Sequence, residues 1–454
     1  MKQIRLNAFD MNCVGHIQQG LWRHPRDRST EYASLDHWVG LAQLLERGLF
    51  DGLFLADVLG VYDVHGGSPG PAIAHAVQVP VNDPLLLIPA MAHATRHLGF
   101  GVTANLSYEP PFTFARRMST LDHLTRGRIG WNVVTGYLDS AARAMGLDRQ
   151  RSHDDRYDVA DDYMEAVYKL WEGSWDDDAV VGDRAAGLYA DPARVRAIHH
   201  HGPYYQVDAI HLSAPSPQRT PVLYQAGSSG RGKRFAGAHA ECVFLNGQAK
   251  SAVRAHVDGI RAEAVAAGRA PDEVLAFVGA TVIVAETDAL AQAKLADYRR
   301  YASPEAALVH ASASMGVDLD RFGMDEKFGS APTQAIASNL QAMAQQGMTK
   351  RKLLDRMVLG SRQAPIVGSP SAIADELIAW VTEADVDGFI LSRTVTPECF
   401  EDFIALVVPE LQRRGAFKER YLEGALRAKL FGAGPHLPVS HPGSKARDIA
   451  RRRT

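Results

Sequence analysis

The chain has 454 residues, of which 46% are hydrophobic and 22% are charged, and its formal net charge is −3. This composition is typical of a folded globular protein and excludes a collagen-like, coiled-coil or wholly disordered chain. The balance of 49 basic and 52 acidic residues gives no electrostatic reason to expect a nucleic acid or an anionic membrane as partner. The longest apolar stretch, Pro84 to Ala92, is about half of the ~20 residues that cross a bilayer, so we expect no membrane span.

The cysteine content and the N-terminal sequence indicate in which cellular compartment the protein is expected. Three cysteines in so long a chain cannot form a disulfide scaffold, and no pair of them has CxxC spacing. The N-terminal MKQIRLNAFDMN lacks the charged, apolar and small-residue regions of a signal peptide. We therefore expect a cytoplasmic protein.

Strand-like apolar runs alternate with helical patterns along the chain. The expected strands cover residues 4–9, 50–57, 97–104, 128–135, 221–227, 241–247, 274–285 and 387–393. The expected helices after them cover 35–45, 84–95, 114–124, 153–171, a segment starting near 231, one ending near 268, 289–298 and 399–415. Strict alternation of this kind predicts an α/β fold of the (β/α)₈ TIM-barrel type. No GxGxxG follows the first strand, which disfavours a dinucleotide-binding Rossmann domain.

The predicted organisation is one barrel domain over residues 1–434 with three long insertions, near 58–83, 175–218 and 301–368. Loops of this length inside a compact domain are usually functional or carry their own structure. The first and third leave at or near the carboxyl-terminal face, where barrel active sites lie. Residues 435–454 form a basic C-terminal extension, which we expect to be solvated or to wrap a neighbouring subunit.

The segment GSSGRGK (227–233) follows a predicted strand and precedes a predicted helix. It nearly matches a nucleotide-binding P-loop, but Arg234 stands where a Mg²⁺-holding hydroxyl is required, so an NTPase is disfavoured. Free backbone N–H groups and the hydroxyls of Ser228 and Ser229 still suit one phosphate group. The alternative is a plain strand-to-helix turn.

Other polar residues occupy positions that suit a ligand on the barrel's carboxyl-terminal face. His153 and Tyr157 are four residues apart, on one face of a first helical turn that Asp154 or Asp155 can cap. Residues near strand ends read as binding or catalytic in a barrel, and they include Asp57, Thr103, Asn105 and Asn132.

Isolated polar residues in loops and a run of histidines are weaker evidence for a catalytic or metal-binding site. Cys13, His16, Tyr62, Gln78 and His310 lie in loops, where a lone residue is more often surface or packing than catalytic. The run HHH (199–201) suggests metal, but tandem histidines on a strand face opposite ways and cannot all ligate one ion. Since no standard metal motif is present either, we expect no metal site.

Six segments carry a resemblance to a known family: NAFDMNCVGHIQQGLWRHP, ERGLFDGLFLADVLGVYDV, VQVPVNDP, RRMSTLDHLTRGRIGWNVVT, HDDRYDVADDYMEAVYKLWEGSW and PSPQRTPVLYQAGSSGRG. From about residue 4 to 430 the chain resembles the flavin-dependent monooxygenases of the bacterial luciferase-like family. It is most similar to the nitrilotriacetate and dibenzothiophene-sulfone branch, in which long-chain alkane monooxygenases resemble it most and dimethyl sulfide monooxygenases next.

The resemblance implies a two-component enzyme: a homodimer or homotetramer served by a separate NAD(P)H:flavin reductase. That reductase supplies reduced FMN (FMNH₂), which reacts with O₂ to a C4a-(hydro)peroxyflavin. One oxygen atom then enters a small or chain-like hydrophobic substrate, with alkane hydroxylation favoured and a dialkyl sulfide or sulfone as the alternative. Two further alternatives keep the fold: F420-dependent hydride transfer, and a flavin-binding barrel without turnover.

The resemblance also implies roles for individual residues. Flavin contacts are expected at Asp57, His153, Tyr157, Ser228 and Ser229, the last four around the phosphate, and at Asn105, Asn132 and Tyr137 for the ring or ribityl chain. The catalytic pocket for substrate and oxygen is expected to be lined by Cys13, His16, Tyr62, Gln78 and His310. His16 or His310 would hydrogen-bond the reactive oxygen, and Cys13 would be a small apolar lining residue. At Tyr137 the alkane enzymes carry histidine, whereas the dimethyl sulfide enzymes carry tyrosine.

Overall fold

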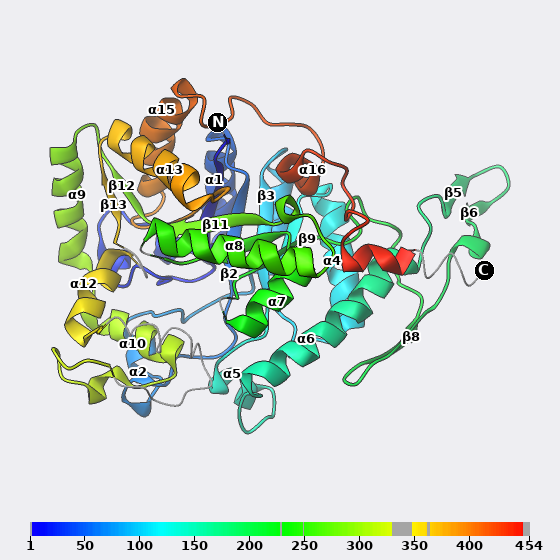
Figure 1. The fold of residues 1–454 in the computed structure, drawn as a ribbon, viewed down its shortest axis with the longest axis horizontal. Helices are drawn as coiled ribbons and strands as arrows, with labels where there is room; N and C mark the ends of the chain where they lie inside the picture. The colour runs from blue at the N-terminus through cyan, green and yellow to red at the C-terminus, as the bar shows by residue number, and fades with distance from the viewer. Residues whose placement is uncertain (1, 228, 248, 329–346, 361–363, 448–454) are drawn as a thin grey trace.

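A closed barrel of eight parallel strands forms the centre of the computed structural model, which describes residues 2–227, 229–247, 249–328, 347–360 and 364–447 (Figure 1). Around the barrel the strands follow the order β1-β14-β11-β10-β9-β4-β3-β2. Their bounds are β1 (Arg5–Met11), β2 (Gly52–Ala56), β3 (Gly99–Asn105), β4 (Ile129–Val134), β9 (Val222–Gln225), β10 (Cys242–Leu245), β11 (Leu275–Ala280) and β14 (Gly388–Ser392). Each lies within or overlaps one predicted run, so the predicted (β/α)₈ fold is confirmed.

The barrel is covered by helices whose apolar side chains recur three and four residues apart. In α1 (Leu35–Arg47) the buried set is Trp38, Leu41, Ala42 and Leu45, which forms one stripe against the strands. The other covering helices are α3 (Ile88–His93), α4 (Pro111–Thr125), α6 (His153–Tyr168), α7 (Gly230–His239), α8 (Lys250–Ala266), α13 (Pro370–Ala384), α14 (Glu398–Asp402) and α15 (Val408–Arg413).

Several predicted helices are divided. The predicted 84–95 helix consists of a short turn, η4 (Pro84–Leu86), followed by α3. α6 continues into a π-helical turn, η5 (Lys169–Gly173), and a second such turn, η9 (Phe403–Val407), joins α14 to α15. Proline near the starts of η4, α3 and α15 suits these divisions, because proline has no N–H to donate and fits the first turn of a helix.

The predicted seventh strand, 274–285, is wrong in its second half. Only β11 belongs to the barrel, and β12 (Val282–Val284) pairs instead with β13 (Ile366–Gly368) in a separate two-stranded sheet. The helix predicted at 289–298, α9 (Asp288–Tyr301), packs against this small sheet. The crossover to the last barrel strand is α13, a helix that the sequence analysis did not predict.

The predicted insertions carry their own structure. The first holds η3 (His65–Gly67) and α2 (Gly70–Ala74); the second holds two antiparallel hairpins, β5 (Val180–Asp183) with β6 (Leu188–Ala190) and β7 (Ile198–His201) with β8 (Gln206–Ala209). The third holds α10 (Pro304–Met315), η8 (Leu319–Arg321) and α12 (Lys350–Gly360). Figure 1 shows α2 and α10 side by side, and their residues are in contact. The first and third insertions therefore meet over one end of the barrel.

The remaining short elements are turns and connections. They are η1 (Leu21–Arg23), η2 (Ser29–Glu31), α5 (Asp139–Ala144), η6 (Pro192–Arg194), η7 (Pro271–Glu273), α16 (Leu426–Phe431) and η10 (Pro442–Ser444). Among the described helices, none is both long and apolar enough to cross a bilayer.

The barrel interior is filled by aromatic side chains. Phe54, Tyr224 and Phe277 are buried there, and α16 adds Leu426 and Leu430 to the same cluster. Glycine is needed where these rings approach the strands: a Cβ at Gly130 would lie 2.4 Å from the Tyr224 ring. The interior is thus a packed core, and any ligand has to bind at the mouth formed by the loops.

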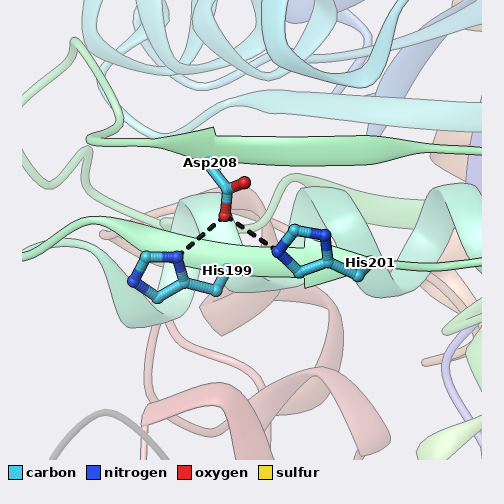
Figure 2. A group of neighbouring side chains, drawn as sticks. All are labelled: His199, His201 and Asp208. Carbon is cyan, nitrogen blue, oxygen red and sulfur yellow. Dashed lines mark hydrogen bonds and ion pairs between the residues drawn. The ribbon is translucent and has the colours of Figure 1, made fainter.

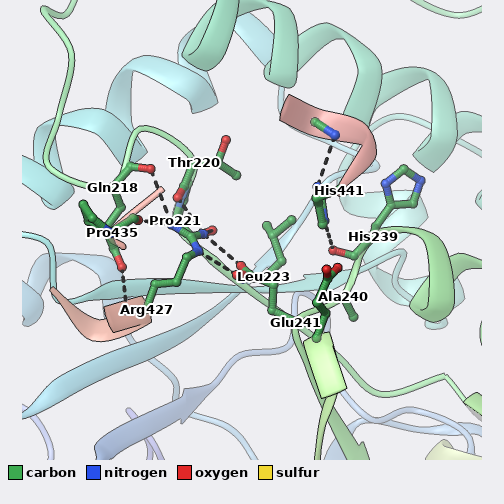
Figure 3. Close-up of polar contacts among 12 residues, drawn as sticks. Gln218, Thr220, Pro221, Leu223, His239, Ala240, Glu241, Arg427, Pro435 and His441 are labelled. Atoms are coloured by element: carbon green, nitrogen blue, oxygen red, sulfur yellow. Dashed lines mark hydrogen bonds and ion pairs between the residues drawn. The ribbon is translucent and has the colours of Figure 1, made fainter. Parts of the chain in front are cut away.

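α16 is held by a buried ion pair (Figure 3). The Arg427 guanidinium donates to both oxygens of Glu241, at 2.6 and 2.8 Å, and to the carbonyls of Thr220, Pro221 and Pro435. Burial alone would lower the pKa of Arg427, but the Glu241 carboxylate outweighs it and raises the pKa. Arg427 therefore holds the C-terminal segment against the residues directly before β9 and β10.

The described part of the C-terminal extension is packed rather than solvated. Leu437, His441 and Ala446 are buried, and the His441 ring bonds the carbonyl of His239 at the end of α7, at 2.9 Å (Figure 3). The expectation of a solvated segment is wrong for residues 435–447, because these side chains complete the core beside α6 and α7. Contact with a neighbouring subunit stays a prediction.

Candidate active site

The starts of two helices meet beside the loop after β9. Ser229 is the N-cap of α7, and its Oγ accepts the N–H of Gly232 at 3.0 Å. His153 is the first residue of α6, and its Nε2 lies 3.3 Å from the same Oγ. The positive ends of two helix dipoles and free N–H groups are thereby gathered in one place, as phosphate binding requires. Ser228, predicted to share this site, lies outside the described residues.

Two glycines let the loop after β9 approach Tyr157 closely. A Cβ at Gly232 would lie 2.9 Å from the Tyr157 hydroxyl oxygen, and a Cβ at Gly227 would lie 2.9 Å from the Gly232 Cα. Burial raises the pKa of Tyr157, so its hydroxyl is a neutral donor. Glycine at these two positions therefore lets the loop pack directly against Tyr157 and places its hydroxyl beside the two helix starts.

Gln225 completes this loop and was missed by the sequence analysis. It is the last residue of β9; its Oε1 accepts the Gly227 N–H at 2.7 Å, and its Nε2 donates to the Tyr157 hydroxyl at 3.4 Å. A buried polar residue at a strand end, two residues before a glycine loop, was the available signal.

Polar side chains lie near the ends of the neighbouring strands β3 and β4. Thr103 and Asn132 are register partners, and the Asn132 Nδ2 donates to the Thr103 Oγ1 at 2.9 Å. The Asn132 Oδ1 is buried and has no hydrogen-bond partner within the described part of the chain. Leaving such an acceptor unpaired costs about 1–3 kcal/mol, so the position fits a ligand that donates an N–H or O–H. Asn105 ends β3, and its Oδ1 accepts the N–H of Ser107 at 2.9 Å.

Asp57 directly follows β2. Burial is the main cause that raises the pKa of its carboxyl to about 7, and the nearby Asp83 carboxylate adds to the rise. A carboxyl in this state can either accept or donate a hydrogen bond near neutral pH.

We expect Asp57→Asn to stabilise the flavin-free protein increasingly as the pH rises from 4 to 8. An unfolded aspartate has its usual low pKa, so the folded state resists ionisation, and the chain loses stability from this group as the pH rises towards 7. The asparagine variant does not undergo that loss, so its free energy of unfolding exceeds that of the parent by at most about 4 kcal/mol at pH 8. Urea unfolding midpoints at several pH values measure it. A constant difference between variant and parent would show that Asp57 titrates normally.

The predicted catalytic residues of the first two loops form a connected polar chain. The Tyr62 hydroxyl donates to the Gln78 Oε1 at 2.7 Å and lies 2.8 Å from the Tyr137 hydroxyl. Gln78 Nε2 in turn donates to the carbonyl of His16 at 3.2 Å. Hydrogen bonds thus bring together residues that are distant in the sequence, while their role in a catalytic pocket stays a prediction.

His310, on α10, lies beside Tyr62. Its ring centre lies 5.7 Å from that of Tyr62. Burial, together with the nearby Arg393 and His310, lowers the pKa of His16 well below its usual value, so His16 is neutral at physiological pH. The His16 Nδ1 is buried without a hydrogen-bond partner among the described residues, which leaves it available to a ligand.

Cys13 has the chemistry of a lining residue. Burial raises the pKa of its thiol to about 12, and the Sγ lies 3.4 Å from the Gly15 carbonyl, to which it donates. A neutral, buried thiol is a poor nucleophile, which agrees with the apolar role expected for it.

Arg393 is a second residue that the sequence analysis missed. It follows β14, forms an ion pair with Asp10 on β1, and donates to the carbonyls of Cys13 and Val14 at 3.2 and 2.7 Å. Burial would lower the pKa of Arg393, but the carboxylates of Asp10 and Asp27 raise it, so the side chain stays charged. It fixes the loop that carries Cys13 and His16. A basic residue ending the last predicted strand was the only signal for it.

Comparison with known proteins identifies the family. Residues 19–388 match the family of luciferase-like monooxygenases. The chain belongs to this family. A long-chain alkane monooxygenase from Geobacillus thermodenitrificans (strain NG80-2) is 48% identical over 450 residues, which are 99% of both chains. A dimethyl-sulfide monooxygenase from Hyphomicrobium sulfonivorans is 46% identical over 98% of this chain and 94% of its own.

Solved structures agree with the family assignment. The crystal structure of a long-chain alkane monooxygenase superposes with a TM-score of 0.91, covering 98% of this chain and 100% of that one. A riboflavin lyase solved with modified FMN and riboflavin, at 38% identity, superposes with a TM-score of 0.93 and covers 98% of this chain and 100% of its own. The predicted class of flavin-dependent monooxygenase is therefore confirmed, while the roles of single residues stay predictions. An F420-dependent alcohol dehydrogenase, at 15% identity, shares only the fold with the enzyme.

Proposed function

We propose that the enzyme binds reduced FMN delivered by a separate NAD(P)H:flavin reductase and inserts one atom of O₂ into a small or chain-like hydrophobic substrate. The observation that carries this proposal is the convergence of two helix starts on the glycine loop after β9, together with buried acceptors on Asn132 and His16 that have no partner in the described part of the chain. When bound, reduced flavin supplies the electrons that activate O₂. The proposal includes a cytoplasmic homodimer or homotetramer.

The chain's own residues have three tasks in this proposal. Ser229, His153 and Tyr157 hold the phosphate, which fixes the depth at which the cofactor lies. Asn132 offers its unpaired Oδ1 to a ring or ribityl donor. The mouth is closed by α2 and α10, which exclude water and so protect a reactive oxygen species from hydrolysis.

A hydrophobic substrate is supported by the surroundings of the predicted catalytic pocket. An apolar cluster joins the first insertion to α10 and contains Tyr62, Val77, Leu138, Ala306, Val309 and Ala313. Burying a hydrocarbon chain among such side chains contributes about 0.8 kcal/mol per CH₂ group. Alkane hydroxylation is the favoured reaction, in line with the alkane monooxygenase relative.

Organosulfur oxygenation is the second candidate. The hydroxyls of Tyr62 and Tyr137 lie together in the pocket wall, and hydroxyls suit the polar oxygen of a sulfoxide product better than an alkane. The dimethyl-sulfide monooxygenase relative supports this alternative.

Product analysis with labelled oxygen tests the proposal. The enzyme is mixed with FMNH₂ without oxygen, then exposed to ¹⁸O₂ with an alkane, a dialkyl sulfide or a sulfone. One ¹⁸O atom in an alcohol or sulfoxide supports oxygenation and names the substrate class. Reoxidation at the rate of free flavin with no labelled product from any substrate, together with turnover of reduced F420, would overturn it.

His310→Phe should lower the rate of oxygenation about a hundredfold and leave the affinity for FMNH₂ within about threefold. The variant removes a ring nitrogen that can hydrogen-bond the reacting oxygen, an effect worth about 10²–10⁴ in rate. Single-turnover product formation and anaerobic flavin titration measure the two quantities. A collapse of flavin affinity with unchanged chemistry would make His310 a flavin contact instead.

A further inference from the structure

Two histidines and an aspartate converge on the exposed face of the β7–β8 hairpin (Figure 2). The His199 Nδ1 lies 2.8 Å from the Asp208 Oδ1, and the His201 Nε2 lies 3.2 Å from the same oxygen. One ligand atom from each of the three residues lies within 4.8 Å of the others. The three side chains therefore point at one place rather than merely sharing a surface.

Strand geometry explains this convergence. In the antiparallel register His199 is opposite Asp208, and alternation along β7 puts His199 and His201 on one face. His200 faces the other way and is buried. The sequence analysis expected no metal because it treated the three histidines as one set, and it did not consider a ligand from the neighbouring strand.

Contacts on the buried side of the hairpin hold it against α6 and so fix the positions of the strands that carry the exposed side chains. The His200 Nε2 lies 2.9 Å from the Asp162 Oδ1 on α6, and the Asp162 Oδ2 accepts the N–H groups of Tyr204 and Tyr205. A Cβ at Gly202 would lie 1.7 Å from Asp162, so only glycine allows this approach. Because the hairpin is anchored to α6, its outward face is preorganised.

A hydrogen bond behind His201 favours a ligating tautomer. Its Nδ1 lies 2.8 Å from the Gln206 Oε1, an acceptor, so Nδ1 carries a proton. The Nε2 then faces the Asp208 carboxylate at 3.2 Å, and a metal ion bound between the two atoms would pair with both. Metal-bound histidines usually donate their other N–H in this way.

We propose that His199, His201 and Asp208 bind one divalent transition-metal ion of the zinc, nickel or cobalt class. Two imidazoles and one carboxylate match the ligand preference of these ions. Bonds of about 2.1 Å to a tetrahedral ion separate ligand atoms by about 3.4 Å, which small side-chain rotations reach from the observed distances. The side chains are 58%, 62% and 52% exposed, so water can complete the coordination.

A second histidine–carboxylate group, His65 with Asp318 and Asp320, is a less suitable metal site. Its carboxylates face opposite ring nitrogens, at 3.6 and 3.4 Å, and the Lys350 ammonium already neutralises Asp320 at 2.8 Å. This arrangement is an ion-pair cluster that links η3 to η8. Within the described part of the chain, Asp208 forms ion pairs with the two histidines and with no lysine or arginine.

The metal would cross-link β7 to β8. The hairpin lies in the insertion between α6 and β9, and its exposed face carries none of the residues placed in the candidate active site. Its expected effect is local: a bound ion stabilises the hairpin by mass action.

Calorimetric titration of the untagged, chelator-treated full chain with ZnCl₂ tests the proposal. We expect one saturable site per chain that His199→Gln/His201→Gln weakens about tenfold or more. Asp208→Asn, which keeps the side-chain shape, should weaken it less and serves as a second variant. The matched control is His93→Gln/His123→Gln, two exposed histidines elsewhere, which should leave the affinity unchanged.

Hydrogen exchange of residues 198–209 supplies an independent measurement. Zn²⁺ should slow exchange there in the parent chain and not in His199→Gln/His201→Gln. The proposal fails if the parent shows no saturable site, or if the double variant binds Zn²⁺ as tightly as the parent.

Discussion

Gly232→Ala is expected to lower the affinity for FMNH₂ about a hundredfold, which corresponds to about 2.7 kcal/mol. The new methyl group would lie 2.9 Å from the Tyr157 hydroxyl and 3.0 Å from the Ser229 Oγ, in the space proposed for the phosphate. It would also separate the phosphate from the α7 N-terminus, where charge-assisted hydrogen bonds are worth about 1.5–3 kcal/mol each. Anaerobic titration of FMNH₂ measures the affinity.

The same helix offers a matched control. Gly230 lies two residues earlier in α7, and a Cβ there would meet nothing within 4 Å, so Gly230→Ala should leave the affinity within about twofold. Alanine is favoured over glycine in helices by about 1 kcal/mol, which offsets part of the strain that the close contacts at position 232 impose. Equal affinities for the two variants would remove the phosphate from this loop. Ser229→Ala with Tyr157→Phe should weaken binding through lost hydrogen bonds alone.

Arg427→Ala is expected to destabilise the fold by about 3–5 kcal/mol. The change leaves the Glu241 carboxylate buried without its cation and removes the donor from the Thr220 and Pro221 carbonyls. Urea unfolding measures the loss. Arg413→Ala, at a side chain 69% exposed, is the control and should cost less than about 1 kcal/mol.

A double variant separates the charge from the packing. Arg427→Met/Glu241→Gln removes both charges, so we expect it to be more stable than Arg427→Ala by about 1–3 kcal/mol. If Arg427→Ala costs no more than Arg413→Ala, the ion pair does not anchor α16. If the double variant is as unstable as the single one, the lost hydrogen bonds to carbonyls, rather than the unpaired charge, account for the cost.

The sequence by itself determined the barrel and half of the proposed phosphate site. Strand runs such as 97–104 are mostly apolar because both faces of a parallel strand are covered, and this pattern is local. His153 with Tyr157 follows from helical spacing within one turn, and Ser229 lies between a strand and a helix as a cap does. The signal for α13 was also present, since its apolar residues recur three and four apart, but the sequence analysis did not assign a helix there.

Only the tertiary structure decided the pairings between distant segments. β12 leaves the barrel to pair with β13, about eighty residues further along the chain, and Arg393 reaches the loop of Cys13 from the opposite end of the sequence. The same holds for Asp208 beside His199, which depends on one hairpin register. Apolar periodicity and helix capping act over a few residues and can be read directly from the chain. Register and barrel closure depend on which distant surfaces bury each other best, and no short stretch of sequence encodes that choice.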